Sequence, residues 1–142
     1  MPDYAKIYFH NNYEITLSSN TTYTFSLQHF KDDPLFDRPF GIITAFNPHN
    51  KTLSYKENLA RNQKLHNELN SKYEFLEAIG CHEGHCEEGY LVFDITLLEG
   101  IELGRRYEQF AVFYNSTVEL QYIDCKDEKV IVKKEREVPK NL

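Results

Sequence analysis

Hydrophobic and polar side chains alternate along residues 22–30, which is the pattern of a strand with one buried face. Residues 40–46 are instead almost entirely apolar, which predicts a central strand covered on both faces. Pro48 ends that strand, because proline cannot donate a hydrogen bond to a neighbouring strand. The same signals predict further strands over residues 4–9, 13–17, 73–81, 89–96, 110–114 and 117–123.

Two segments carry the sequence signature of a helix start. Ser54 and Glu57 form a capping box, in which each side chain satisfies a free backbone donor, and Thr96 with Glu99 repeats it. Apolar residues recur every three or four positions after the first box, which predicts a helix of about five turns with Asn62 interrupting its apolar face. The second helix is expected to run to about residue 107.

The order of these elements lacks the regular alternation of strand and helix that builds a parallel sheet. We therefore predict an α+β fold, a mostly antiparallel sheet with two helices packed on it, in one compact domain over residues 1–125. Residues 126–142 are charged around a short apolar stretch and are expected to form an edge strand or a tail. Gly100 and Gly104 weaken the second helix, so we expect its backbone to approach the sheet closely there.

The charge of the chain argues against two classes of partner. Its 142 residues hold 16 Lys and Arg against 22 Asp and Glu, and the net charge of −6 disfavours binding to nucleic acid or to an anionic membrane. The N-terminal sequence lacks the apolar stretch of a secretory signal, and no apolar run approaches the ~20 residues of a membrane span. We therefore expect a cytoplasmic protein with reduced cysteines, whose oligomeric state these features do not determine.

Cysteine and histidine cluster within residues 81–86. Because thiolate and imidazole are the usual zinc ligands, Cys81, His82, His85 and Cys86 are candidate metal ligands. A two-residue turn between them would set Cys81 opposite Cys86 and His82 opposite His85, and would send the two pairs to opposite faces. The favoured interpretation is therefore a hairpin tip without a site. A Cys81–Cys86 redox pair and a zinc site are the alternatives, and no other cofactor is predicted.

Polar residues gather where the strand over residues 40–46 ends and the first helix begins. Backbone donors and short polar side chains converge at such junctions, which makes them frequent ligand sites. The structural alternative is that Asn47 forms a turn before proline and that Asn62 is a buried amide tying helix to sheet. The candidate set comprises Thr44, Asn47, Asn58, Arg61, Asn62 and, in the step Glu87-Glu88-Gly89, Glu88.

Arg105 and Arg106, with Gln109, form a further polar group. Two guanidinium groups can hold a carboxylate or phosphate through paired hydrogen bonds. Such a pair more often stabilises the C-terminal end of a helix. The sequence contains neither GxxxxGK nor GxGxxG, so a nucleotide-binding loop does not support the first interpretation.

A set of motifs lies between Phe40 and Tyr114, at residues 42–48, Glu57-Asn58, Arg61-Asn62, 88–92, 103–107, Gln109 and 111–113. In these motifs the sequence resembles the bacterial family called domain of unknown function 3293. That family has no assigned activity, and the resemblance implies a small bacterial cytosolic protein. The recurring polar positions of the family match Thr44, Asn47, Asn58, Arg61, Asn62, Glu88 and Arg105, whereas the Cys and His residues of 81–86 depart from its usual turn.

Three hypotheses about function follow from these features. The leading one is a non-enzymatic binding or regulatory domain that recognises a protein or a small polar ligand near Asn47, Asn58 and Asn62, since uncharged polar groups gather there without an activated nucleophile. The second is a small hydrolase or transferase that uses Glu88 as base and Arg105 to hold an anion. The third is a metal or redox module at residues 81–86.

Overall fold

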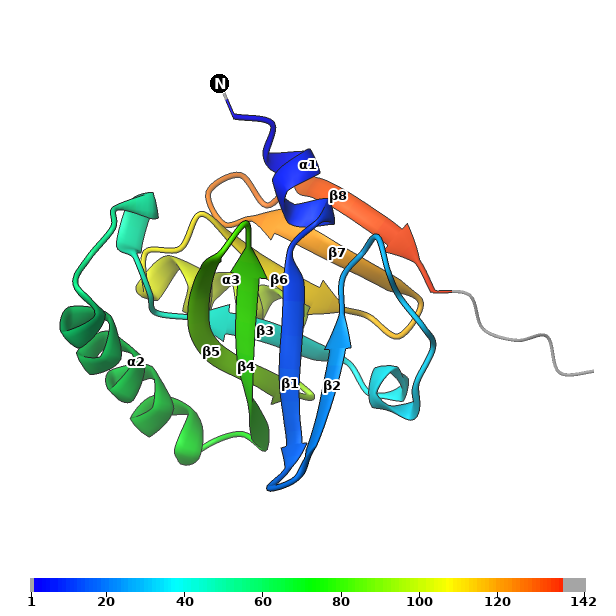
Figure 1. Cartoon of the computed structure of the whole chain (residues 1–142), viewed down its shortest axis with the longest axis horizontal. Coiled ribbons are helices and arrows are strands. Elements are labelled where there is room, and N and C mark those ends of the chain that lie inside the picture. The colour runs from blue at the N-terminus through cyan, green and yellow to red at the C-terminus, as the bar shows by residue number, and fades with distance from the viewer. Residues whose placement is uncertain (1, 137–142) are drawn as a thin grey trace, which may run out of the picture.

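The computed structural model describes residues 2–136 as one eight-stranded sheet with the order β2-β1-β4-β5-β3-β6-β7-β8. Neighbouring strands pair antiparallel throughout, and the sheet curls strongly (Figure 1). The predicted α+β class is confirmed. The strands are β1 (Asn12–Ser18), β2 (Thr21–Phe25), β3 (Phe40–Thr44), β4 (Phe75–His82), β5 (His85–Phe93), β6 (Ala111–Asn115), β7 (Glu119–Asp124) and β8 (Val130–Glu135).

The helices begin where the capping residues predict. Ser54 and Glu57 form the capping box of α2, and Thr96 and Glu99 form that of α3. Each box satisfies two backbone donors that a helix start would otherwise leave free. The helices are α1 (Tyr4–Phe9), α2 (Tyr55–Asn70) and α3 (Leu97–Arg106), with short 3-10 turns η1 (Pro34–Asp37) and η2 (Pro48–Asn50).

The curled sheet has two faces, and each carries its own hydrophobic core. We call the face covered by α2 and α3 the helix face, and its core is formed by residues such as Leu65, Val92 and Ile101. We call the enclosed face the inner face, and its core includes the buried rings of Phe25 and Phe113. Strands from both ends of the sheet contribute to the inner core, because the curl brings them together.

Gly104 lets α3 lie close to the sheet, as predicted. A Cβ atom at this position would stand 2.6 Å from Cys125 Sγ and 2.6 Å from Val112 Cγ1, so a larger residue would displace the helix. Gly100 differs, because a Cβ atom there would have nothing within 4 Å. The close approach therefore explains one of the two glycines.

The prediction of a strand over residues 4–9 is wrong, because the segment is helix α1. Asp3 caps its first turn by accepting a hydrogen bond from the backbone N–H of Lys6 at 3.1 Å. Tyr4 and Tyr8 lie four residues apart and therefore share one side of the helix. Both rings pack against Phe110, and this contact stabilises a helix, because a strand would not bring the two tyrosines to the same place.

Two further strand predictions are too long. The strand predicted over residues 22–30 ends at Phe25, because Ser26 and His29 close a turn through two hydrogen bonds. The strand predicted over residues 40–46 ends at Thr44, whose hydroxyl accepts a hydrogen bond from the backbone of Phe46. The strand predicted over residues 89–96 begins earlier, at residue 85, and ends at residue 93.

The C-terminal segment contains the predicted edge strand, β8, which pairs with β7. Arg136 follows it and is almost fully buried, at 6% side-chain exposure. Its guanidinium contacts Asp32 at 2.6 Å and Asp37 at 2.6 Å, and so ties β8 to the segment around η1. The predicted tail, residues 137–142, lies outside the described residues. Within residues 2–136, none of the helices has the length and apolarity needed to cross a membrane.

Candidate functional site

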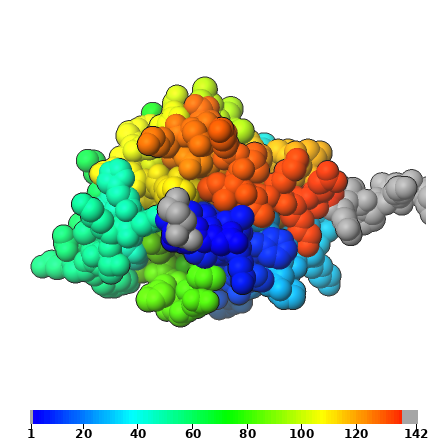
Figure 2. All heavy atoms as spheres, turned by 90° about the horizontal axis from the view of Figure 1, so that it is seen from above, coloured from blue at the N-terminus to red at the C-terminus, as the bar shows by residue number. Residues whose placement is uncertain are grey.

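A cavity of about 680 Å³ opens on the inner face between α1, the β4–β5 hairpin and the loop that follows β3. Figure 2 looks onto this end of the molecule and shows α1, in blue, lying between the teal segment that leads into α2 and the orange segment of β7 and β8. Cavities of this size accommodate small organic ligands. The curl of the sheet therefore creates a recess large enough for such a ligand.

One wall of the cavity consists of aromatic rings. Tyr8 stacks on Tyr122 with ring centroids 4.6 Å apart, and Tyr4 lies 4.4 Å from Phe110. Tyr13 continues this wall, and its ring stacks on that of Tyr122 with the centroids 6.3 Å apart. These residues come from α1, β1, β7 and the segment before β6, so the wall exists only once the sheet has curled.

Glu87 stands on the polar side of the cavity. Side chains alternate between the two faces of a strand, so Glu87 in β5 shares the inner face with Leu91 and Phe93. Asn47 Nδ2 donates a hydrogen bond to Glu87 Oε2 at 2.8 Å. Burial raises the pKa of the Glu87 carboxyl, and the hydrogen bond from Asn47 opposes part of that rise because it stabilises the charged form.

Asn47 is held in place by Asn58. Asn58 Nδ2 donates to Asn47 Oδ1 at 2.8 Å, and the backbone N–H of Asn47 donates to Asn58 Oδ1 at 2.8 Å. The backbone N–H of Leu53 also donates to Asn47 Oδ1. Asn47 has a φ of 49°, and His49 in the same turn has a φ of 53°, a left-handed conformation that non-glycine residues rarely adopt. This network fixes the turn and aims the Asn47 amide at Glu87.

The tyrosine hydroxyls of the cavity keep their protons at neutral pH. Burial raises the pKa of Tyr122 to about 12, and it also raises the pKa values of Tyr8 and Tyr13 well above the ordinary 10.0. Asn11 Nδ2 donates to the Tyr122 hydroxyl at 3.2 Å. The wall therefore offers neutral rings and hydroxyls, with no phenolate charge.

Three of the seven predicted site residues line the cavity, namely Thr44, Asn47 and Asn58. Thr44 donates its hydroxyl to the carbonyl of Glu88 at 2.6 Å, and so links β3 to β5. The other four predicted residues do not line this cavity. The proximity of Asn47 and Asn58 follows from the junction of strand and helix on which the prediction was based.

Arg61 and Asn62 bind the backbone beneath the junction. Arg61 Nε donates to the carbonyl of Ala45 at 2.7 Å, and its terminal nitrogen donates to the carbonyl of Tyr107 at 2.8 Å. Asn62 Oδ1 accepts a hydrogen bond from the backbone N–H of Ala45 at 3.3 Å. Asn62 is therefore placed as the buried amide that ties helix to sheet.

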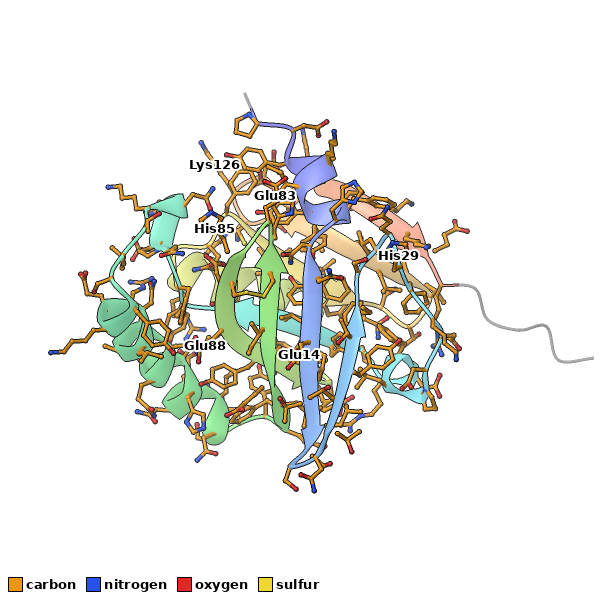
Figure 3. All side chains as sticks on the ribbon, viewed as in Figure 1. Glu14, His29, Glu83, His85, Glu88 and Lys126 are labelled. Atoms are coloured by element: carbon orange, nitrogen blue, oxygen red, sulfur yellow. A yellow bond between two sulfur atoms is a disulfide. The ribbon has the colours of Figure 1, made fainter. Side chains whose placement is uncertain are left out.

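Glu88 and Arg105 lie apart and have different partners. Glu88 lies on the side of β5 that faces α2, where it accepts a hydrogen bond from the Tyr55 hydroxyl at 2.5 Å (Figure 3). Arg105 at the end of α3 donates to the carbonyl of Cys125 at 2.5 Å and pairs with Glu128 at 3.0 Å. Arg105 therefore fastens the β7–β8 turn to α3.

Sequence reasoning named the step Glu87-Glu88-Gly89 but chose Glu88 over Glu87 as the candidate, and it missed the aromatic wall. The register of β5 held a usable signal, because Gly89, Leu91 and Phe93 mark one face and Glu87 falls two residues before them. The aromatic wall gave no such signal. Tyr8 and Tyr122 meet only through the curl of the sheet, and the prediction of a strand over residues 4–9 hid the face of α1.

The β4–β5 hairpin has the predicted two-residue turn, with Cys81 opposite Cys86 and His82 opposite His85. Glu83 and Gly84 both have positive φ, which suits a tight hairpin turn. The structure departs from the expectation of reduced thiols at this pair, because in it the two sulfurs form a disulfide with an S–S distance of 2.09 Å. Adjacent strands place directly opposite side chains within bonding reach, which explains the pairing.

The histidines of the hairpin lie on the cavity side, and His85 stands near the upper end of the sheet below α1 (Figure 3). In residues 2–136 no three His, Cys, Asp or Glu side chains are grouped so as to hold a metal ion, and the zinc hypothesis stays an untested prediction. Cys125 is the free cysteine, and burial raises the pKa of its thiol to about 12. A reactive thiolate at neutral pH is therefore not expected there.

Comparison with known protein families gives a match to the middle of the chain, over just under half of its length. The family described as "Protein of unknown function (DUF3293)" matches residues 43–112, a stretch that runs from β3 to the start of β6. It includes Asn47, Asn58 and Glu87, and it excludes α1 and the tyrosines of β1 and β7. No curated protein and no solved structure matches the chain.

Proposed function

The chain belongs to this family of unknown function, and from that premise we propose that it is a binding domain whose inner-face cavity holds a small organic ligand. The observation that carries the proposal is the composition of the cavity, which joins an aromatic wall to a few fixed polar groups around Glu87. Ligand sites commonly have this combination, because apolar walls supply affinity and a few polar groups fix orientation. The proposed role is binding, with no chemical step.

The polar network supports the proposal as well. The side-chain oxygen Oδ1 and the backbone N–H of Asn47 form hydrogen bonds with Asn58 and Leu53. The side-chain nitrogen Nδ2 therefore points to Glu87 and positions its carboxylate. A binding site needs such support, because a side chain that must reorient loses affinity. The Asn47, Asn58 and Glu87 arrangement is therefore already organised before any ligand enters.

A cavity-filling substitution tests this function. Ala111 lines the cavity at the start of β6, and Ala111→Leu should fill the space that a ligand needs. Ala60 lies on the exposed side of α2, so Ala60→Leu adds the same atoms away from the cavity. We expect 2-phenylethanol, followed by protein-observed NMR, to bind the wild type and Ala60→Leu and to lose at least about tenfold in affinity for Ala111→Leu, a loss of about 1.4 kcal/mol.

Equal binding to all three proteins would contradict the cavity as the site. Native mass spectrometry of untagged protein provides an independent readout, since a co-purified ligand adds mass to the wild type and should be missing from Ala111→Leu. The melting temperatures of the two variants should be compared first, so that lost binding is measured on folded protein.

The Cys81–Cys86 disulfide favours a second function, a redox-sensitive hairpin beside the cavity. We also propose that the protein works in a bacterial cytoplasm, where thioredoxin and glutathione reduce most disulfides. Under both proposals the pair would cycle between thiol and disulfide in cells. Alkylation of thiols at the moment of lysis, read by mass spectrometry, should find both cysteines reduced before peroxide treatment and joined after it. A pair that stays oxidised throughout would contradict the cytoplasmic location.

The enzyme hypothesis based on Glu88 and Arg105 stays a prediction. The two groups are bonded to different elements, so a substrate would have to bring them together. A carboxylate at the cavity is supplied instead by Glu87, which makes Glu87 the residue to substitute in any screen for turnover.

A further inference from the structure

We propose that the ligand of the cavity is an organic ammonium ion with an apolar or aromatic body. This inference rests on the proposed binding function and adds the chemical class of the ligand. It follows from three features of the lining: its charge, the free oxygen of Glu87, and the aromatic rings opposite.

The charge of the lining selects against anions. Among the described residues that line the cavity, Glu87 is the one carboxylate, and no lysine or arginine is present. Apart from the imidazoles of His82 and His85, a phosphate or carboxylate ligand would find no cationic side chain to pair with, and it would face the Glu87 carboxylate. The net charge of −6 extends the same preference to the whole molecule, because it draws cations and repels anions during approach.

Glu87 has one oxygen available for a ligand. Asn47 donates to Oε2, and within residues 2–136 no hydrogen bond reaches Oε1. A carboxylate in a recess binds most strongly to a charged N–H donor, because the ionic and hydrogen-bond attractions then act together. The Asn58 contacts fix Asn47, and Asn47 in turn fixes the direction in which Oε1 is presented.

The aromatic wall suits a cation as well as an apolar group. The face of a tyrosine or phenylalanine ring carries negative potential and attracts ammonium groups within about 6 Å. Tyr8, Tyr13 and Tyr122 contribute such rings, and their raised pKa values keep them neutral, so the hydroxyls donate to and accept from a ligand without ionising. An ammonium group beside Glu87 with a ring or chain against this wall uses both sides of the cavity.

A series of probes of equal shape and different charge tests the inference. The series is 2-phenylethylammonium, 2-phenylethanol and phenylacetate, titrated near neutral pH and followed by protein-observed NMR. We expect the ammonium ion to bind about tenfold more tightly than the alcohol, and phenylacetate to bind more weakly than either. Chemical-shift changes should map to residues of the cavity lining.

Glu87→Gln and Glu88→Gln form a matched pair of variants. The substitutions are identical and adjacent, but Glu87 faces the cavity and Glu88 faces α2. Glu87→Gln should remove the preference for the ammonium ion while the alcohol still binds. Glu88→Gln should keep the wild-type preference. The probe series on the wild type tests the inference by itself if Glu87→Gln does not fold.

The outcomes separate the ligand class from the binding function. Binding of the alcohol with no preference for the ammonium ion would overturn the ammonium inference and leave the binding function standing. Preferential binding of phenylacetate would overturn it in the same way. Failure of all three probes, together with a bare polypeptide mass in native mass spectrometry, would overturn both.

Discussion

The two faces of the sheet use their polar side chains in opposite ways. On the helix face, Arg61 and Asn62 form hydrogen bonds with the backbone carbonyl and N–H of Ala45. Arg105 likewise donates a hydrogen bond to the backbone carbonyl of Cys125, at the β7–β8 turn. On the inner face, Glu87 lines the cavity and accepts one hydrogen bond at Oε2, while Oε1 has no hydrogen-bond partner among residues 2–136. A polar group whose partners all belong to the protein supports the fold, whereas a polar group with capacity left over can recognise something else.

The contrast is sharpest between neighbours in the chain. Glu87 and Glu88 are the same residue type in the same strand, and the alternation of the strand sends them to different faces. Glu88 accepts a hydrogen bond from the Tyr55 hydroxyl, while Glu87 is half-buried beside the Asn47 amide that orients it. Residue type therefore does not distinguish the two, and position in the register does.

The largest expected effect is on the helix face. Arg61→Met removes the charged donors to the carbonyls of Ala45 and Tyr107, and it should lower the free energy of unfolding by about 3 kcal/mol. Urea denaturation at constant pH measures this loss. Affinity for 2-phenylethylammonium should stay within about twofold of wild type while the variant is folded. A variant of unchanged stability and lost affinity would remove the distinction between the two faces.

A smaller effect is expected on the inner face, and it has the opposite sign. Burial raises the pKa of Glu87 above its ordinary value of 4.5, so the folded protein holds this proton more tightly than the unfolded chain does. The stability that comes from the group is present below that ordinary value and is lost as the pH rises through the raised pKa. At neutral pH, Glu87→Gln should therefore raise the melting temperature, by up to about 3 °C.

Thermal unfolding across a range of pH checks this prediction. The gain from Glu87→Gln should vanish in acid, below the ordinary pKa of the carboxyl, where wild-type Glu87 is protonated in both states. Glu88→Gln loses a single exposed hydrogen bond, and its stability should stay within about 0.5 kcal/mol of wild type. A loss of stability in Glu87→Gln at neutral pH would mean that the carboxylate serves the fold.

The sequence predicted the elements whose signals are local. The two capping boxes placed the starts of α2 and α3, because a cap requires particular side chains three residues apart. The tight turn at Glu83 and Gly84 was enough to predict that Cys81 stands opposite Cys86, because a two-residue turn fixes the register of both strands. Residues 4–9 failed because six residues are too few to separate an alternating pattern from a helical one.

Only the part of the candidate site that has a local sequence signal was predicted. Thr44, Asn47 and Asn58 meet at a junction of strand and helix, which the sequence shows directly. Glu87 was passed over for Glu88, because the choice depends on which face of β5 is enclosed. The tyrosines came from segments more than a hundred residues apart, and their meeting depends on the curl of the whole sheet.

The Cys81–Cys86 disulfide has a consequence for the register in which β4 and β5 pair. If β4 and β5 slipped by one residue, each side chain on the slipped strand would move to the other face, and Glu88 would replace Glu87 at the cavity. A covalent bond between Cys81 and Cys86 admits a single alignment, in which these two residues stand opposite each other. When it is formed, the disulfide locks the register that the two-residue turn sets, and so keeps Glu87 rather than Glu88 on the cavity side.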